Sequence, residues 1–189
     1  RDGLKMGMPV FPLDWVGATP EESFMGFRGA GFVPEAMVNF LALLGWNPGT
    51  EQEIFTMEEL IEQFDISKIS KAGARFDYEK AKWFNQKYLS AMPNDQLAAV
   101  LKPMAEARGL RSDLPFLAKF GGAMKERAVF LDDFFRDGKF FFETIEEFDR
   151  DMVAKKWFPM TAHIFADFSE KMAEIQPFEA APLEELAKK

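Results

Sequence analysis

The sequence predicts an all-α fold, a multi-helix bundle in which antiparallel helix pairs are joined by short links. Three observations support this prediction. Apolar residues recur at helical spacing in several segments, and signals that start and stop helices flank those segments. No stretch alternates apolar and polar residues for long enough to indicate a sheet. Residues 1–33 are rich in Gly and Pro, so we expect that segment to be mostly irregular.

The first two expected helices are separated by an Asn-Pro-Gly turn and cover residues 34–45 and 56–65. Pro34 stands at a first helical position, where its missing N–H costs nothing. Gly45 ends the run, as glycine commonly does at a helix C-terminus. Thr56 and Glu59 form a capping box, in which each side chain accepts from the other residue's backbone N–H.

A third helix is expected over residues 77–91. Asp77 is a good N-cap, and Trp83, Phe84 and Tyr88 form an apolar stripe at helical period. Met92, Pro93 and Asn94 combine a helix breaker with a cap. We therefore expect one domain over residues 1–92 and a second over residues 93–189.

The second half is also expected to be helical. Pro103 should kink or shorten the first of its helices, and Gly121-Gly122 should separate the next two. Thr144 and Glu147 form a second capping box, whereas the triple Phe before it is ambiguous between a short strand and a buried helix entry. The expected helices cover residues 94–108, 112–120, 123–136, 144–156 and 159–175.

Composition limits the function. The chain has 189 residues, 48% of them hydrophobic, which is enough for a packed core. It contains no Cys, which excludes disulfides and cysteine-based zinc sites and fits a reducing cytosol. No apolar run is long enough for a membrane span, and nothing at the start resembles a signal peptide.

The net charge of -8 argues against nucleic-acid binding, because phosphate contacts need Lys and Arg. The charge is segregated, however. Residues 66–87 hold six basic and two acidic residues, and residues 102–127 hold six basic and three acidic ones. If these two segments form one continuous face, nucleic-acid binding gains support, and if they are scattered it loses support. The alternative is that they are ordinary solvated helix faces.

Three segments resemble bacterial glutamyl-tRNA synthetases just after their catalytic domain. They match the family patterns GF(L/V)PEA…NFLALLGW at residues 31–46, EIF(T/S)xEELIxxF at 53–64 and FDxEKxxWxNxxY at 76–88. Together with the opening Arg1-Asp2-Gly3, they follow the family order in one register over about half the chain, which is more specific than a short motif match. After Met92 the resemblance rests on helix pattern and on Lys125-Glu-Arg127.

The resemblance implies what this chain contains and what it lacks. No HIGH-type signature occurs, since the one histidine is His163, and the KLSK lysines of the family would precede Arg1. We therefore expect an excised piece with the stem-contact region and part of the anticodon-binding domain. Its partners would include the missing catalytic domain and the missing C-terminal subdomain of the same chain.

Arg127 is the strongest candidate for a binding residue. The resemblance implies that an arginine in the first helical subdomain of the anticodon-binding region reads the third anticodon letter, and Met124–Val129 gives the best local match. A planar guanidinium can bond to or stack on a splayed base. The alternative is an exposed helix arginine paired with Glu126 or Asp132.

Lys80 and Lys82 are the second candidates, because lysines on this family-like helix can contact backbone phosphates of a tRNA stem. A solvated face is the alternative for each of them. Arg1 would be a remnant of the ATP-contacting loop, without a role of its own. For His163 we expect a packing or surface role, and the four Trp side chains are expected to be core anchors rather than base-stacking platforms.

The resemblance implies a cytoplasmic parent enzyme that attaches glutamate to its tRNA with ATP and Mg²⁺. This chain would supply tRNA docking and anticodon recognition, would hold no catalytic residue, metal or cofactor, and would be inactive alone. The competing hypothesis is an acidic helical protein-interaction module with no nucleic-acid role, which the sequence pI of about 4.9 favours. An independent enzyme is a third possibility, and the missing catalytic residues oppose it.

Overall fold

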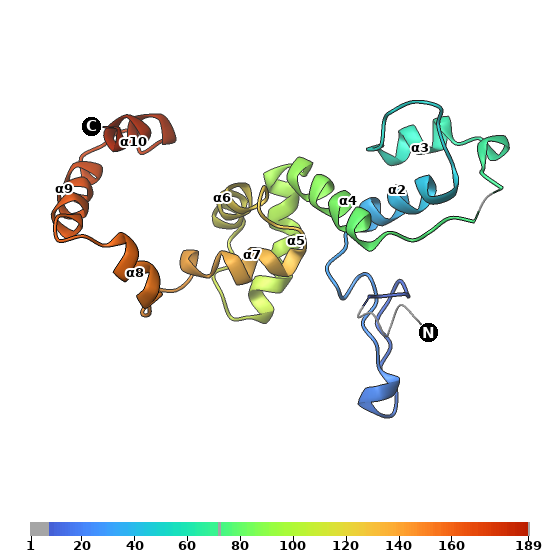
Figure 1. Ribbon diagram of the computed structural model, residues 1–189, viewed down its shortest axis with the longest axis horizontal. Coiled ribbons are helices and arrows are strands. Elements are labelled where there is room, and N and C mark those ends of the chain that lie inside the picture. Colours follow the sequence, from blue (N-terminus) through green and yellow to red (C-terminus); the bar gives the residue numbers. More distant parts are fainter. Residues whose placement is uncertain (1–7, 72, 189) are drawn as a thin grey trace. The chain divides into compact units, whose positions relative to one another are not determined.

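The structure is a computed structural model that describes residues 8–71 and 73–188. Within these residues every regular element is helical, which confirms the all-α prediction (Figure 1). The α-helices are α2 (Pro34–Gly45), α3 (Met57–Gln63), α4 (Tyr78–Ala91), α5 (Asn94–Ala107), α6 (Leu114–Met124), α7 (Leu131–Asp137), α8 (Arg150–Lys156), α9 (Thr161–Ala173) and α10 (Ala180–Ala187). Short 3-10 turns lie at η1 (Pro20–Glu22), η2 (Ile66–Lys68) and η3 (Lys139–Phe141).

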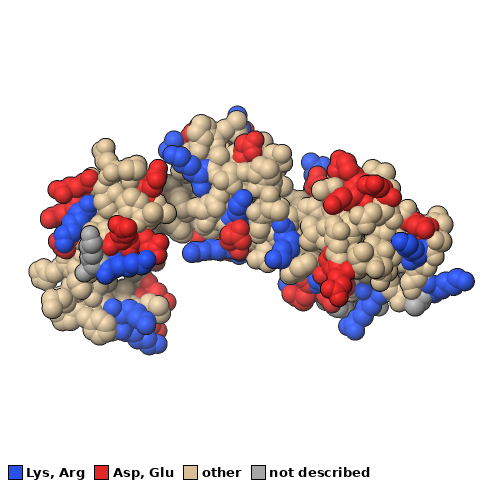
Figure 2. Space-filling model, turned by 90° about the horizontal axis from the view of Figure 1, so that it is seen from above, with Lys and Arg blue, Asp and Glu red and all other residues tan. Residues whose placement is uncertain are grey.

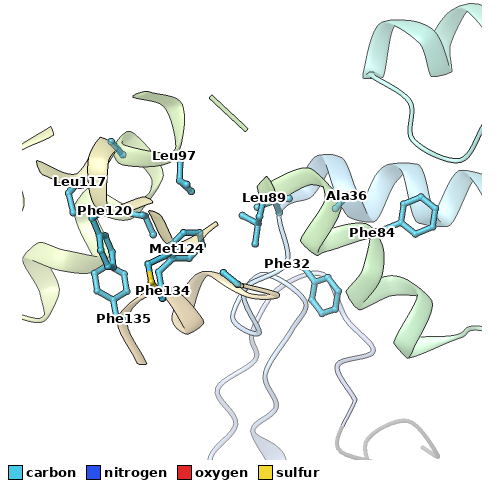
Figure 3. Packing of buried hydrophobic residues seen from close by; sticks show 14 of the residues in the cluster. Phe32, Ala36, Phe84, Leu89, Leu97, Leu117, Phe120, Met124, Phe134 and Phe135 are labelled. Carbon is cyan, nitrogen blue, oxygen red and sulfur yellow. The ribbon is translucent and has the colours of Figure 1, made fainter. Parts of the chain in front are cut away.

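The chain forms two compact units, Arg1–Thr144 and Ile145–Lys189. The first unit contains one main hydrophobic core, to which α2 and α4 contribute at one end and α5, α6 and α7 at the other (Figure 3). Phe84 of α4 and Phe120 of α6 are both fully buried in it. The core therefore continues across the boundary that the sequence suggests at Met92.

Local signals explain where the first helices begin. Val33 is extended and Pro34 occupies the first position of α2. The predicted capping box is present, with Thr56 N–H donating to Glu59 Oε2 at 2.7 Å and Glu59 N–H donating to Thr56 Oγ1 at 3.2 Å. Asp77 caps α4 by accepting from the Lys80 N–H.

The prediction of a helix break at Gly121-Gly122 is wrong, because α6 runs through both glycines to Met124. The glycines serve the close approach of α5. A Cβ on Gly121 would lie 2.9 Å from Leu97 Cδ2, and one on Gly122 would lie 2.6 Å from Asn94 Nδ2. The break comes later, in the turn before α7.

Pro103 does not end α5, which continues to Ala107. Leu101 and Ala105, on either side of Pro103, are both fully buried, so packing holds the helix through the missing hydrogen bond. The expected helix start at Thr144 is also wrong. Asp149 caps α8 instead, accepting from two backbone N–H groups at 2.9 and 3.0 Å.

The second unit consists of α8, α9 and α10, and none of its described residues is buried. Several large apolar side chains there are exposed, and Trp157 stacks on Phe165 with ring centroids 5.8 Å apart. No helix in the described part of the chain is both long and apolar enough to cross a membrane.

Tyr88 ties α4 to α2 and to the segment before α3. Its hydroxyl donates to the Phe55 carbonyl oxygen and lies 2.8 Å from Asn39 Oδ1, which also accepts from the Phe55 N–H at 2.9 Å. Burial, reinforced by the negative charge of Glu35, raises the pKa of Tyr88 to about 12. The neutral phenol is thus the form that the folded state favours.

The stability difference between the wild type and Tyr88→Phe should depend on pH in the alkaline range. Because the folded pKa lies above the unfolded value near 10, the contribution of Tyr88 is complete below about pH 10. It should be lost progressively as the pH rises toward about 12. Urea unfolding of both proteins from pH 8 upward measures this, and a constant difference up to pH 12 would contradict it.

Candidate functional site

Residues 125–130 form the turn between α6 and α7, here called the Arg127 turn. Arg127 lies in this turn and not in a helix, so the expected helix over residues 123–136 is wrong at its start. Its side chain is exposed and has no hydrogen-bond or ion-pair partner among the described residues. The alternative pairing with Asp132 is excluded, since Asp132 instead binds Arg108 at 2.8 Å.

The backbone of the Arg127 turn is fixed from the side of α4. Asn85 Nδ2 donates to the Val129 carbonyl oxygen at 2.6 Å. Gln86 Nε2 donates to the Glu126 carbonyl oxygen at 3.4 Å, and Lys125 Nζ donates to the Met92 carbonyl oxygen at 3.2 Å. Three side-chain hydrogen bonds thus join the turn to α4 and to the residue that follows it.

Asp133 fixes the same turn from the side of α7. Its Oδ2 accepts from the backbone N–H groups of Val129 and Phe130 at 2.9 and 2.8 Å. Its Oδ1 lies 2.8 Å from Arg136 Nη1. Asp133 is only 5% exposed, and this buried carboxylate is well satisfied because a cation and two N–H groups surround it. The turn is therefore rigid in its backbone, whereas Arg127 projects freely.

Lys80 and Lys82 lie on opposite sides of α4, since two residues correspond to a rotation of about 200°. Lys80 Nζ is 2.5 Å from Glu53 Oε1. Lys82 Nζ is 2.6 Å from Glu79 Oε1 and lies 5.2 Å from the centre of the Tyr78 ring. Both lysines are therefore already paired, and a phosphate would have to compete with a carboxylate for each of them.

Lys82 shares a side of α4 with the Arg127 turn, whereas Lys80 does not. Gln86 stands one turn after Lys82 on the same face of the helix, and Gln86 contacts Glu126 directly. Lys80 is directed toward Glu53 instead. Lys82 therefore lies on the side of α4 that faces the Arg127 turn, and Lys80 lies on the other side.

A further group of charges lines an open cavity of about 470 Å³ beside α7. Its cations come from three elements: Arg108 at the end of α5, Arg136 in α7 and Lys139 in η3. Each is paired, with Arg108 bound to Asp132, Arg136 to Asp133 and Asp137, and Lys139 to Glu143. The Arg136 guanidinium donates to the Asp137 carboxylate, and this hydrogen bond raises the pKa of Arg136 above its ordinary value.

Lys and Arg side chains do not merge into one surface on the face drawn in Figure 2. Basic side chains there occur in small groups, and acidic and uncharged residues separate these groups. On this face the scattered cations count against nucleic-acid binding. Charge distribution alone therefore does not identify a nucleic-acid interface.

Three other candidates have different outcomes. Arg1 lies outside the described residues. His163 is exposed on α9. The expectation for the tryptophans holds for Trp46, which is 3% exposed, but is wrong for the others, since Trp15, Trp83 and Trp157 are all at least one-third exposed. Trp83 lies on α4 outside the buried stripe of Ala81, Phe84 and Leu89, and Trp157 lies in the second unit, in which no described residue is buried.

Asn85 is one position of the family pattern at residues 76–88, but it was not predicted as a site residue. A signal was present, because Asn85 falls on the buried stripe of α4 together with Ala81, Phe84 and Leu89. A polar residue on such a stripe needs buried partners. Neither those partners nor Asp133's role can be read from the sequence alone.

Two family models match the chain. A model described as "tRNA synthetases class I (E and Q), catalytic domain" matches residues 22–83. A second, "Anticodon binding domain", matches residues 96–189. The Arg127 turn lies within the second range, and the two lysines of α4 lie within the first.

Curated relatives and solved structures agree with these models. A glutamate–tRNA ligase of Cytophaga hutchinsonii is 41% identical over 173 residues, which is 92% of this chain and 34% of that protein. One of Christiangramia forsetii is 40% identical over 188 residues, which is 100% of this chain and 37% of that protein. A crystal structure of a glutamate tRNA ligase from Elizabethkingia meningosepticum superposes with a TM-score of 0.87 at 40% identity, covering 100% of this chain and 37% of the other. The chain thus spans about a third of the length of these relatives.

Proposed function

Because the chain belongs to the glutamyl-tRNA synthetase family of class I enzymes, we propose that it is the tRNA-docking and anticodon-recognition part of a glutamate–tRNA ligase. The whole enzyme would use ATP and Mg²⁺ to attach glutamate to its tRNA. This chain would contribute binding and discrimination, with no catalytic residue. The observation that supports it best is the free guanidinium of Arg127 on a rigid turn inside the range matched by the anticodon-binding model.

The proposal gives each candidate residue a separate role. Arg127 would contact the third anticodon base, since its guanidinium is exposed and would lose no internal partner on binding. Lys82 would contact a backbone phosphate on the same side of α4. Lys80 would do so only by leaving Glu53, so its contribution should be smaller.

The two parts of the chain would contact different regions of the tRNA. Residues 1–92 would contact the tRNA stem and residues 93–189 would form the first part of the anticodon-binding domain. Among the described residues, no group of His, Cys, Asp and Glu side chains is placed to hold a metal ion. ATP and Mg²⁺ would be used by the whole enzyme, and Arg1 would be a remnant of the nucleotide loop. We propose that the whole enzyme is cytoplasmic.

Arg127→Gln tests the proposal directly. Anisotropy titrations would compare glutamate tRNA with the same tRNA changed at its third anticodon letter, at low and moderate salt. The wild type should prefer the unchanged tRNA, and binding should weaken with salt because phosphates are contacted. Arg127→Gln should reduce that preference by about 10-fold or more, since one base contact contributes about 1–3 kcal/mol.

Arg150→Gln is the matched control, because Arg150 is also exposed and has no hydrogen-bond or ion-pair partner in the part of the chain that the structure describes, and the charge change is the same. It should leave the third-letter preference intact. If Arg127→Gln retains the wild-type preference, Arg127 is not the reading residue. If the wild type binds neither tRNA, the protein-interaction hypothesis gains, which the interleaved charges of Figure 2 also favour.

A further inference from the structure

Asn85 joins three parts of the chain that are far apart in sequence. Its Oδ1 accepts from the Val33 N–H at 2.8 Å, and its Nδ2 donates to the carbonyl oxygens of Gly31 and Val129 at 3.1 and 2.6 Å. Both amide hydrogens are therefore used. Asn85 is 0% exposed, so water does not compete with these bonds.

The bond to Val129 acts on the site because Val129 follows Arg127 by two residues. Asp133 Oδ2 accepts from the Val129 N–H, so buried side chains bind both polar groups of this residue. Ala128, between Arg127 and Val129, is 1% exposed. Arg127 thus projects from a backbone whose following residues cannot move independently of α4.

The same bond sets the spacing between Arg127 and Lys82, since Asn85 and Lys82 lie on one helix. In one nucleic acid, the distance between a given base and a given backbone phosphate varies only within a limited range. A protein that presents their two partners at a fixed separation avoids the entropic cost of arranging them on binding. Asn85 contributes by restraining the backbone from which Arg127 projects relative to the helix that carries Lys82.

We propose that Asn85 is a positioning residue for anticodon recognition, holding the Arg127 turn in register with α4. This inference rests on the proposed function of Arg127. Asn85 itself is buried and touches no nucleic acid. Its effect on recognition would pass through the Arg127 turn alone.

Asn39 provides a matched comparison for a purely structural role. It is also an asparagine at 0% exposure, on α2, and its Oδ1 accepts from the Phe55 N–H and lies 2.8 Å from the Tyr88 hydroxyl. It makes no hydrogen bond to the Arg127 turn. Asn39→Ala and Asn85→Ala should therefore both lower the melting temperature, but only Asn85→Ala should affect recognition.

The experiment measures the third-letter preference of the wild type, Asn85→Ala and Asn39→Ala below their melting temperatures. Asn85→Ala should reduce the third-letter preference by about 10-fold, and Asn39→Ala should leave it unchanged. Combining Asn85→Ala with Arg127→Gln should lose no more than Arg127→Gln alone, because both changes act on one contact. An unchanged preference in Asn85→Ala, or a fully additive double variant, would overturn the proposal. Asn85→Ser replaces Asn85→Ala if the latter does not fold.

Hydrogen exchange separates failure of this inference from failure of the proposed function. Backbone amides of residues 126–130 should exchange at least about 10-fold faster in Asn85→Ala than in the wild type, and no faster in Asn39→Ala. Unchanged exchange there would overturn the positioning role, whatever the tRNA data show. Faster exchange in a protein with no third-letter preference would instead overturn the role in recognition and count against Arg127 as the reading residue.

Discussion

Replacing Phe120 by alanine should lower the free energy of unfolding by about 3–5 kcal/mol. Phe120 is 1% exposed and its ring contacts several others, with centroid distances of 4.8 Å to Phe142, 5.3 Å to Phe141 and 5.9 Å to Phe135. Figure 3 shows its ring beside those of Phe134 and Phe135. Removing it leaves a cavity that α5, α6 and α7 cannot close without losing their mutual contacts. Urea unfolding followed by circular dichroism measures the loss.

Phe140→Ala is the control for this prediction. Phe140 is the first of three consecutive Phe residues, and the other two, Phe141 and Phe142, contact Phe120. Phe140 itself is 50% exposed, and its closest ring partner is Phe141 at 4.7 Å. Its replacement should cost less than about 1 kcal/mol, because little buried surface is lost. Equal losses for the two variants would show that Phe120 is not central to the core.

Gly31→Ala should destabilise the protein by about 2–3 kcal/mol. Gly31 has a φ of 87°, a conformation that disfavours other residues. A Cβ there would also lie 3.2 Å from both Leu131 N and Phe130 Cβ, and so would press on the end of the Arg127 turn. The carbonyl oxygen of Gly31 is in addition a partner of Asn85.

Gly49→Ala separates the two causes. Gly49 has nearly the same φ, 88°, but a Cβ there would meet nothing within 4 Å. Its replacement should cost only about 1 kcal/mol, for the backbone conformation alone. Thermal unfolding of both variants gives the comparison. Similar losses of stability in the two variants would mean that the contact of the added Cβ with the Arg127 turn contributes nothing to the destabilisation.

Local signals predicted part of the fold well. The helix beginning at Pro34 and ending at Gly45 and the capping box of Thr56 and Glu59 were confirmed, because prolines, glycines and caps act within a few residues. The Gly121-Gly122 break failed for the opposite reason. Whether a glycine ends a helix or admits a neighbouring one depends on α5, which adjacent residues do not reveal.

The candidate site was predicted less completely than the fold. The sequence singled out Arg127 but placed it in a helix, with Glu126 or Asp132 as its partner in the alternative interpretation. In the structure Arg127 lies in a turn, and Asp132 pairs with Arg108. The surroundings of Arg127 depend on Asn85 and Asp133, whose contacts cross tens of residues or a helix end. Residue type shows which chemistry is possible, and tertiary structure decides which groups are free to perform it.

The sequence separations around Asn85 bear on the order of folding. Its three hydrogen bonds span 52, 54 and 44 residues, whereas α5 and α6 are neighbours along the chain and form the most extensive helix contact. Closing long loops costs more chain entropy and slows the contacts that require it. We therefore expect the helical hairpin of α5 and α6 to form first and the junction at Asn85 to close late. The geometry around Arg127 would then be among the last parts of this unit to be established and among the first to be lost.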